Sequence, residues 1–332
     1  MSINPDMRLA EGFFDDPEKL PTRDGFGKGA VEAGKADERV VVLSADLAES
    51  TRAEWFQKEF PERFVEMGVA EQNMATVAAG MANYGKIPFI TSYAAFSPGR
   101  NWEQIRTTIA LNNVPVKVCG MHAGVSVGPD GATHQMLEDI ALMRAMPNMT
   151  VFSPCDAEEA RKATLSAARL KGPAYLRFGR EKTPVFTTAD TPFEVGKANV
   201  LWRAGEITVA LFATGPLVHN ALLAARELEK EGIASAVVNV HTIKPLDTET
   251  LVRLAREAGA VVTIEEHQVQ GGLGGAVAEC LAREAPTPIE FVGVQDSFGQ
   301  SGAPDELIAH YRMDAAHIIE SARKAAARRA RG

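Results

Sequence analysis

Two short segments carry side chains that could support acid–base or stacking chemistry. In FVEMGVAEQNM, residues 64–74, Glu71 follows an apolar run and a glycine and opens a helical pattern. A carboxylate in a first helical turn complements the helix dipole, so Glu71 alone is interpreted as a helix-terminal charge. In TSYAAFSPGR, residues 91–100, Tyr93 and Phe96 stand three positions apart directly after a strand-like run. That spacing can place both rings on one side of a loop or helix start, although an aromatic pair usually belongs to a core.

A third segment, HAGVSVGPDGATHQ at residues 122–135, groups two of the seven histidines of the chain with an aspartate. His122 and His134 bracket the segment, and Asp130 lies between them. Its glycines suit a loop that brings backbone close to a ligand. Paired histidines can donate hydrogen bonds, relay protons or bind a metal. No third ligand stands nearby at a recognisable metal-site spacing, so we interpret the segment as a polar contact surface for an oxygen-rich substrate.

The elements that must position these side chains follow from alternating β-rich and helical patterns. The strand-like runs are rich in Val, Ile, Leu or Phe and end at glycine, proline or polar residues. They cover residues 39–44, 87–92, 114–121, 150–153 and 174–178. The helical pattern that Glu71 opens has apolar residues at positions 74, 77, 78 and 81, the spacing of a buried helix face. Such alternation favours a parallel sheet covered by helices.

The same pattern repeats in the second half of the chain. Its strand-like runs cover residues 207–212, 236–240, 260–264 and 288–292, with helical patterns at 220–230 and 248–257. Residues 187–198 have weak periodicity and many turn formers, so we place a linker there. The sequence therefore predicts an α/β protein of two domains, residues 1–190 and 191–332, each a mostly parallel sheet with helices on both faces.

Composition narrows the class of protein. The 332 residues exceed what one hydrophobic core usually serves, and 45% hydrophobic with 23% charged residues is typical of a globular enzyme. A formal net charge of −8 argues against nucleic acid or an anionic membrane as the main partner, because both select basic surfaces. The three cysteines form no C-x-x-C pair, which is typical of reduced thiols. No apolar run approaches the roughly 20 residues of a membrane span, so we expect a cytoplasmic protein.

Seven motifs, in order along the chain, resemble those of the transketolase family. They are SADL (44–47), GVAEQNM (68–74), TSYAAF (91–96), GPDGATHQ (128–135), LRFGR (176–180), NVHTIKPLD (239–247) and EEHQVQGGLGGAVAE (265–279). The first five resemble the pyrimidine-binding domain of that family, and the last two resemble its C-terminal domain. The resemblance runs from about Arg23 to the last helix and implies thiamine diphosphate as cofactor.

The resemblance implies that six residues contact this cofactor. Glu71 matches the glutamate that hydrogen-bonds a ring nitrogen of the aminopyrimidine and favours its imino tautomer, a task that needs a carboxyl group in a dry pocket. Tyr93 and Phe96 match the aromatic positions that stack on the pyrimidine, with tyrosine where the family usually has phenylalanine. Three further positions match residues near the cofactor: Asp46, Leu47 and Val69. The two apolar residues among them are also compatible with positions in the hydrophobic core.

The resemblance also implies a sugar channel. His122, Asp130 and His134 match residues that hydrogen-bond the hydroxyl and carbonyl oxygens of the donor sugar. We place His134 nearest the oxygen on which charge develops, so both histidines join Glu71 in the predicted catalytic set. The phosphate-binding positions at the channel mouth match Arg23, Ser50 and Arg180. Two arginines with fork geometry suit an anionic substrate, although each could instead form a surface ion pair.

A partner chain is expected because one family motif is missing. Full-length transketolases hold Mg²⁺ and the diphosphate of the cofactor with a G-D-G motif, and this sequence contains none. The glycine-rich GGLGG at residues 271–275 is separated from its strand, and is a weak dinucleotide-binding match that helix packing also explains. We therefore expect an N-terminal transketolase subunit to hold the Mg²⁺ and the diphosphate, and assign no metal ligand to this chain. Two copies of each chain are expected to assemble, with self-association of this one.

The sequence thus predicts the C-terminal subunit of a split transketolase, which moves a two-carbon ketol unit from a ketose phosphate to an aldose phosphate. The nearest alternative is the β subunit of a two-oxoacid dehydrogenase decarboxylating component, whose substrates lack the hydroxyls and phosphate of a sugar. A non-catalytic transketolase-like subunit is a further alternative. Such a subunit would be expected to lose Glu71 or the histidines.

Overall fold

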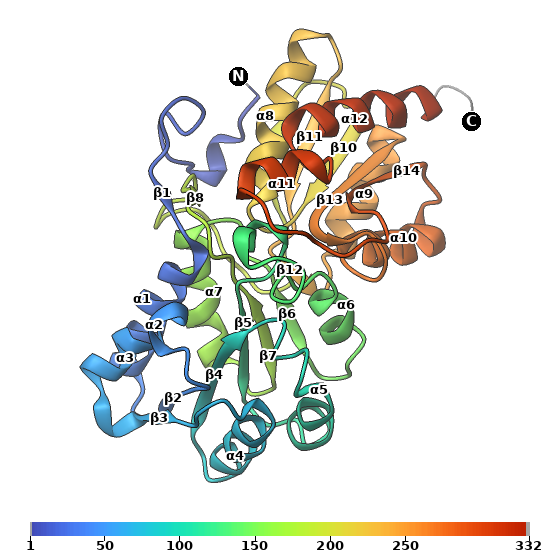
Figure 1. The fold of residues 1–332 in the computed structure, drawn as a ribbon. Helices are drawn as coiled ribbons and strands as arrows, with labels where there is room; N and C mark the ends of the chain where they lie inside the picture. Colours follow the sequence, from blue (N-terminus) through green and yellow to red (C-terminus); the bar gives the residue numbers. More distant parts are fainter. Residues whose placement is uncertain (1, 330–332) are drawn as a thin grey trace.

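The computed structural model describes residues 2–329, and the first of its two large sheets has seven strands (Figure 1). In spatial order these are β12 (Thr242–Lys244), β6 (Thr150–Phe152), β7 (Ala174–Arg177), β5 (Lys117–Met121), β4 (Ile87–Tyr93), β2 (Val40–Ser44) and β3 (Phe64–Glu66). Only β12 is antiparallel to its neighbour. In β2, Val40 and Val42 pack on one side of the sheet and Val41 and Leu43 on the other, so the strand is buried on both faces.

The second sheet has five strands. In spatial order they are β14 (Ile289–Val294), β13 (Val261–Gln268), β10 (Val209–Ala213), β11 (Ser235–Asn239) and β9 (Asn199–Arg203). Only the edge strand β9 is antiparallel. Each predicted strand-like run overlaps one of the observed strands, with bounds that differ by a few residues, and the predicted fold class is confirmed. The sequence patterns did not indicate the antiparallel edge strands β9 and β12.

Helices cover both faces of the first sheet. On one face lie α1 (Thr22–Ala36), α3 (Ala53–Glu59) and α7 (Ala157–Arg169). On the other lie α4 (Glu71–Asn83), α6 (Asp139–Arg144) and the π-helical turn Ile105–Ala110. This turn follows the short α5 (Trp102–Gln104). Helices α1 and α7 pack closely because α1 is rich in glycine. A methyl group at Gly25 would overlap the backbone carbonyl of Ala157. The short α2 (Ala48–Thr51) follows β2.

Helices also cover both faces of the second sheet. Figure 1 shows α8 (Leu217–Lys230) and α12 (Ala315–Arg329) together on one face, and α9 (Thr248–Ala258) and α10 (Leu273–Glu284) cover the other. The short α11 (Pro304–His310) packs against the 3-10 turn Val125–Asp130 of the first half. No helix within residues 2–329 is long and apolar enough to cross a membrane.

The two halves of the chain are tightly joined. One hydrophobic cluster contains Met74 and Ile90 from the first half and Phe212 and Val277 from the second. Strand β12 comes from the second half but extends the first sheet, and Ile3 pairs with β9 of the second sheet. The domain boundary near residue 190 stays a prediction. Strand β12 follows this boundary but belongs to the first sheet, and Ile3 precedes it but pairs with the second sheet.

The GGLGG segment serves helix packing. The buried Glu265 carboxylate accepts hydrogen bonds from the Leu273 and Gly274 amides, both at 2.7 Å, at the start of α10. A methyl group at Gly272 would overlap that carboxylate. Burial raises the pKa of Glu265 to about 7, against the opposing effect of the two amides. Because an internal carboxylate already fills the helix N-terminus, a phosphate has no room there.

Candidate active site

Most predicted site residues lie at the carboxyl ends of neighbouring strands in the first sheet, the edge where α/β folds bind ligands. Asp46 and Leu47 follow β2, Val69 and Glu71 follow β3, Tyr93 ends β4, His122 follows β5 and Arg180 follows β7. These five strands are adjacent in the sheet, so residues far apart in sequence share one edge. The other positions lie on α1, on α2 and on the loops after β4 and β5: Arg23, Ser50, Phe96, Asp130 and His134.

Glu71 begins α4 and is only 1% exposed, as a carboxyl group in a dry pocket must be. Its carboxylate accepts hydrogen bonds from Ser92 Oγ at 3.3 Å and from Arg100 Nη1 at 2.9 Å. Asn101 Nδ2 fixes the helix start by donating to the Glu71 carbonyl at 3.0 Å. Sequence reasoning missed Arg100, although it ends the TSYAAFSPGR segment. Its side chain is 49% exposed, so this arginine can exchange the carboxylate for water when another group binds Glu71.

An aromatic cluster extends from Glu71 to the histidines. The Tyr93 and Phe96 rings are stacked, with centroids 5.8 Å apart and planes 17° apart. His122 lies 4.2 Å from the Tyr93 ring, and His134 lies 5.4 Å from the Phe96 ring. The Arg100 guanidinium lies 4.9 Å from the Phe96 centroid. The structure therefore brings together the predicted stacking pair and both predicted catalytic histidines.

His122 is held as a neutral imidazole. Burial, together with the nearby charges of Arg23 and Arg180, lowers its pKa to about 3. Arg23 Nη1 lies 3.0 Å from His122 Nε2 and can only donate, so the proton of the ring is on Nδ1. Within residues 2–329, that Nδ1 and Arg23 Nε are buried without a hydrogen-bond partner. Two unsatisfied buried donors at one site indicate that a polar ligand completes it.

The two predicted phosphate-binding arginines differ in their surroundings. Arg23 Nη1 also donates to the Ser50 carbonyl at 2.8 Å, so it links α1 to α2 and to His122. Arg180 Nη1 donates to Asp130 at 2.8 Å, in an ion pair whose side chains are 33% and 32% exposed. Arg180 therefore lies in the more open part of the site. In the described residues no partner contacts its Nη2 or Nε atom, so these remain available to an anion.

The remaining predicted cofactor contacts lie beside Glu71 and β2. Val69 is 71% exposed, which rules out the alternative that it is a core residue. Leu47 is half-buried and belongs to none of the hydrophobic clusters of residues 2–329. Asp46 is exposed, with a left-handed φ of 60°, and its amide donates to Glu66 Oε1 at 2.7 Å. The edge of the sheet thus presents an open apolar surface next to a buried carboxylate.

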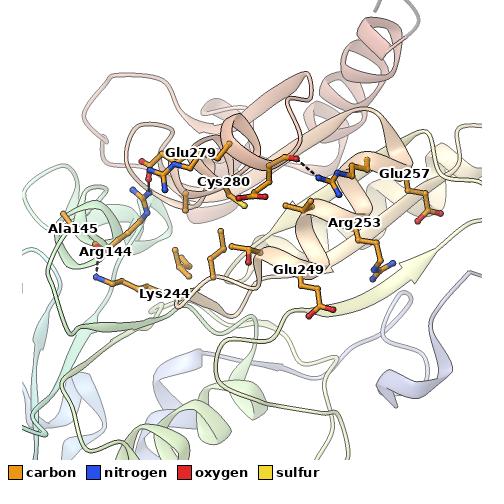
Figure 2. A pocket seen from close by; sticks show the side chains of 16 residues that line it. Arg144, Ala145, Lys244, Glu249, Arg253, Glu257, Glu279 and Cys280 are labelled. Carbon is orange, nitrogen blue, oxygen red and sulfur yellow. Dashed lines mark hydrogen bonds and ion pairs between the residues drawn. The ribbon is translucent and has the colours of Figure 1, made fainter.

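A groove of about 1200 Å³ lies elsewhere, between α9, α10 and the segment around Arg144 (Figure 2). Polar contacts between neighbouring elements line it, among them the ion pair of Arg144 with Glu279 and the hydrogen bond that Arg256 Nη2 donates to the Glu284 carbonyl. None of the predicted site residues lines this groove. Among residues 2–329, no group of three or more His, Cys, Asp or Glu side chains is placed to hold a metal ion.

Two family models match this architecture. The model of the transketolase pyrimidine-binding domain matches residues 18–185, and that of the transketolase C-terminal domain matches residues 196–318. The chain belongs to the transketolase family, which confirms the resemblance inferred from the seven motifs. The cofactor that this family implies is thiamine diphosphate.

Relatives of similar length place the chain within the family. It is 44% identical over 301 residues to the putative transketolase C-terminal section of Methanocaldococcus jannaschii, covering 90% of this chain and 94% of that one. It is 39% identical over 307 residues to a 6-deoxy-6-sulfo-D-fructose transketolase subunit of a Clostridium strain, covering 92% and 95%. A solved structure described as the inactive β4 tetramer of a split-gene transketolase matches with a TM-score of 0.86 at 46% identity, covering 93% and 99%. This chain therefore contains the same two domains in the same order, a pyrimidine-binding domain followed by a transketolase C-terminal domain.

Proposed function

We propose that this chain is the C-terminal subunit of a split transketolase that transfers a two-carbon ketol unit from a ketose phosphate to an aldose phosphate. The observation that carries the proposal is a continuous contact path from buried Glu71 to neutral His122, which runs through Arg100, Phe96, His134 and Tyr93. Such a path suits a heteroaromatic cofactor at one end and an oxygen-rich substrate at the other. The name of the Clostridium relative, a sulfosugar transketolase subunit, supports the reaction class.

The residues present fit the pyrimidine half of thiamine diphosphate. Bound at this edge, the cofactor would supply a thiazolium carbon able to carry the ketol unit. Glu71 would hold a ring nitrogen, for which Arg100 must yield one carboxylate oxygen. Tyr93 and Phe96 would hold the ring faces, and the apolar rim would be supplied by the exposed Val69 and by the half-buried Leu47, with Asp46 alongside.

The substrate contacts follow from the opposite end of the path. His122 Nδ1–H and Arg23 Nε–H are the unsatisfied donors, suited to hydroxyl or carbonyl oxygens of a sugar. Asp130 would accept from a hydroxyl, and His134 would donate to the oxygen that becomes negative. Arg180, together with Ser50 near the mouth, would receive the phosphate.

An N-terminal subunit with a G-D-G motif would hold Mg²⁺ and the diphosphate, so that the cofactor lies between two chains. We expect two copies of each chain in the active assembly, in a cytoplasmic location. The inactive β4 tetramer of the split-gene relative supports both self-association and the need for a partner. In the isolated chain, the 71% exposed Val69 beside Glu71 is a surface that such a partner would cover.

The test is a comparison of substrates in a complex reconstituted from both subunits with thiamine diphosphate and Mg²⁺. We expect a ketose phosphate and an aldose phosphate to give two new sugar phosphates that differ from the substrates by a two-carbon unit, detected by mass spectrometry. Pyruvate or a branched two-oxoacid should release no CO₂. CO₂ release without sugar exchange would instead identify a two-oxoacid decarboxylating subunit.

A further inference from the structure

The second half of the chain contacts the loop that carries the predicted sugar-binding residues. This loop, residues 124–135, contains Asp130 and His134 and follows directly on His122. Glu266, from β13 of the second sheet, accepts a hydrogen bond from the Ser126 amide at 2.7 Å. Its side chain is almost completely buried at the junction of the two halves.

The Glu266 carboxylate also packs against the first glycine of the loop. A methyl group at Gly124 would overlap this carboxylate, and Gly124 has a φ of 91°, which side chains rarely adopt. Glycine is therefore needed at this position both for its conformation and for the approach of Glu266. The contact is close enough to fix where the loop leaves β5.

A second contact holds the far end of the loop. Gln135 Nε2 donates to the Val125 and Gly128 carbonyls within the loop, at 3.0 and 3.1 Å, and to the Gln300 carbonyl of the second half at 3.0 Å. A methyl group at Gly299 would overlap the Gln135 amide. One buried amide thus ties the two ends of the turn to each other and to the segment that precedes α11.

A buried ion pair fixes the strand from which Glu266 projects. Arg177 donates through Nε to Asp139 and through Nη2 to the backbone carbonyl of Glu266, at 2.8 and 2.7 Å. Arg177 and Asp139 are both buried, so this cross-link excludes water. Burial raises the pKa of Glu266, and Arg177 and the Ser126 amide act in the opposite direction. Either form of the carboxyl group offers an oxygen to the Ser126 amide.

We propose that Glu266 and Gln135 are positioning residues for sugar recognition: they hold the loop so that Asp130 and His134 face the substrate, although neither would touch it. This role rests on the proposed ketol transfer. It assigns a task in the reaction to the C-terminal half of the chain, which contributes no predicted site residue of its own. Because Glu71 and the aromatic pair lie outside the loop, cofactor activation should not depend on either residue.

The first test uses hydrogen–deuterium exchange of the complete chain, without a partner. In Glu266→Ala we expect amide exchange in peptides covering residues 124–135 to become at least tenfold faster, with Ser126 the most affected. Glu266→Gln keeps an acceptor oxygen at the same reach and should stay within about threefold of the unchanged chain. Glu231→Ala, which removes an exposed carboxylate paired with Arg323, is the matched control and should leave the loop unchanged.

The second test uses the reconstituted complex and separates the loop from the cofactor site. For Glu266→Ala and Gln135→Ala we expect kcat/KM for ketol transfer to fall about ten- to a hundredfold. Exchange of the thiazolium C2 proton should stay within twofold, and Glu266→Gln should restore transfer. If Glu266→Ala does not fold, Glu266→Asp, which withdraws the acceptor by one methylene group, should give the same pattern in weaker form.

Several results would overturn the inference. Unchanged loop exchange in the alanine and aspartate variants would show that Glu266 does not hold the loop. Faster amide exchange in the loop with unchanged ketol transfer would show that Glu266 has no role in the reaction. A loss of thiazolium C2-proton exchange that parallels the loss of ketol transfer would show that the substitution disturbs the cofactor site and not the loop alone. Absence of C2 exchange and transfer in the unsubstituted complex would refute the proposed function itself, while the loop contact would still be judged by hydrogen exchange.

Discussion

The two arginines assigned to the substrate phosphate should respond differently to substitution. Arg180 lies in the open part of the site and contacts Asp130, whereas Arg23 also contacts His122 and the Ser50 carbonyl. Arg180→Ala should therefore remove the phosphate contact and the partly exposed ion pair with Asp130, while the contacts of His122 stay in place. Asp130 is 32% exposed and can be hydrated when its partner is lost, so the variant should lose no more than about 1 kcal/mol of stability.

The expected kinetic effect follows from the kind of contact that is lost. A hydrogen bond to a charged group contributes about 1.5–3 kcal/mol, and each tenfold change in affinity corresponds to about 1.4 kcal/mol. The phosphate lies far from the bond that breaks, so its contact is nearly equal in the ground and transition states. Arg180→Ala should raise the Michaelis constant for a phosphorylated sugar roughly ten- to a hundredfold. Because Arg180 is one-third exposed, the lower end applies, and kcat should change little.

The assay is steady-state kinetics of the reconstituted complex on matched phosphorylated and free sugars. Arg180→Ala should leave the free sugar almost unaffected, whereas Arg23→Ala should impair both substrates because it also disturbs His122. Arg312→Ala, which removes an exposed ion pair with Glu320, controls for the loss of an arginine elsewhere. Equal losses on both sugars for Arg180→Ala would refute a role in phosphate recognition.

Three further predictions concern the cofactor and the histidine. Glu71→Gln should lower exchange of the thiazolium C2 proton in the reconstituted complex by orders of magnitude while the subunits still assemble; an unchanged rate would return Glu71 to the role of a helix-terminal charge. Val69→Asp should weaken thiamine diphosphate binding more than tenfold in a calorimetric titration of the complex, yet change the melting temperature of this chain by less than about 2 °C because Val69 is exposed. The His122 ring should stay neutral in an NMR titration down to about pH 4, because burial and the charges of Arg23 and Arg180 lower its pKa to about 3. Its pKa should rise in Arg23→Ala, and protonation near pH 6.5 in the unsubstituted chain would contradict the observed burial.

The sequence predicted those features that depend on local pattern. Nine strand-like runs were recognised because each is a short β-rich segment, and Glu71, Tyr93 and His122 were proposed as site residues because each belongs to a motif that resembles the transketolase family. Strand β12 was missed because it is three residues long and pairs with a strand of the other half. No local pattern marks that pairing.

Partnerships between distant residues were not predictable in the same way. Arg100 lies 29 positions from Glu71, and Glu266 lies 140 positions from Ser126. Spacing along the chain carries no information about such contacts until the fold is known. The exposure of Val69 was likewise not predictable, because a single valine outside a periodic segment does not show whether it lies on the surface or in the core.

Reconstitution is the most direct test of the central claim, which is that this chain forms one half of an active site and a second chain completes it. This chain should be purified with an N-terminal transketolase section from the same genome, recognised by its G-D-G motif, and ketol transfer measured with thiamine diphosphate and Mg²⁺. We predict no detectable turnover by either chain alone and full turnover by the equimolar mixture, with Glu71→Gln in this chain abolishing it. Full turnover by this chain without a partner would contradict the claim.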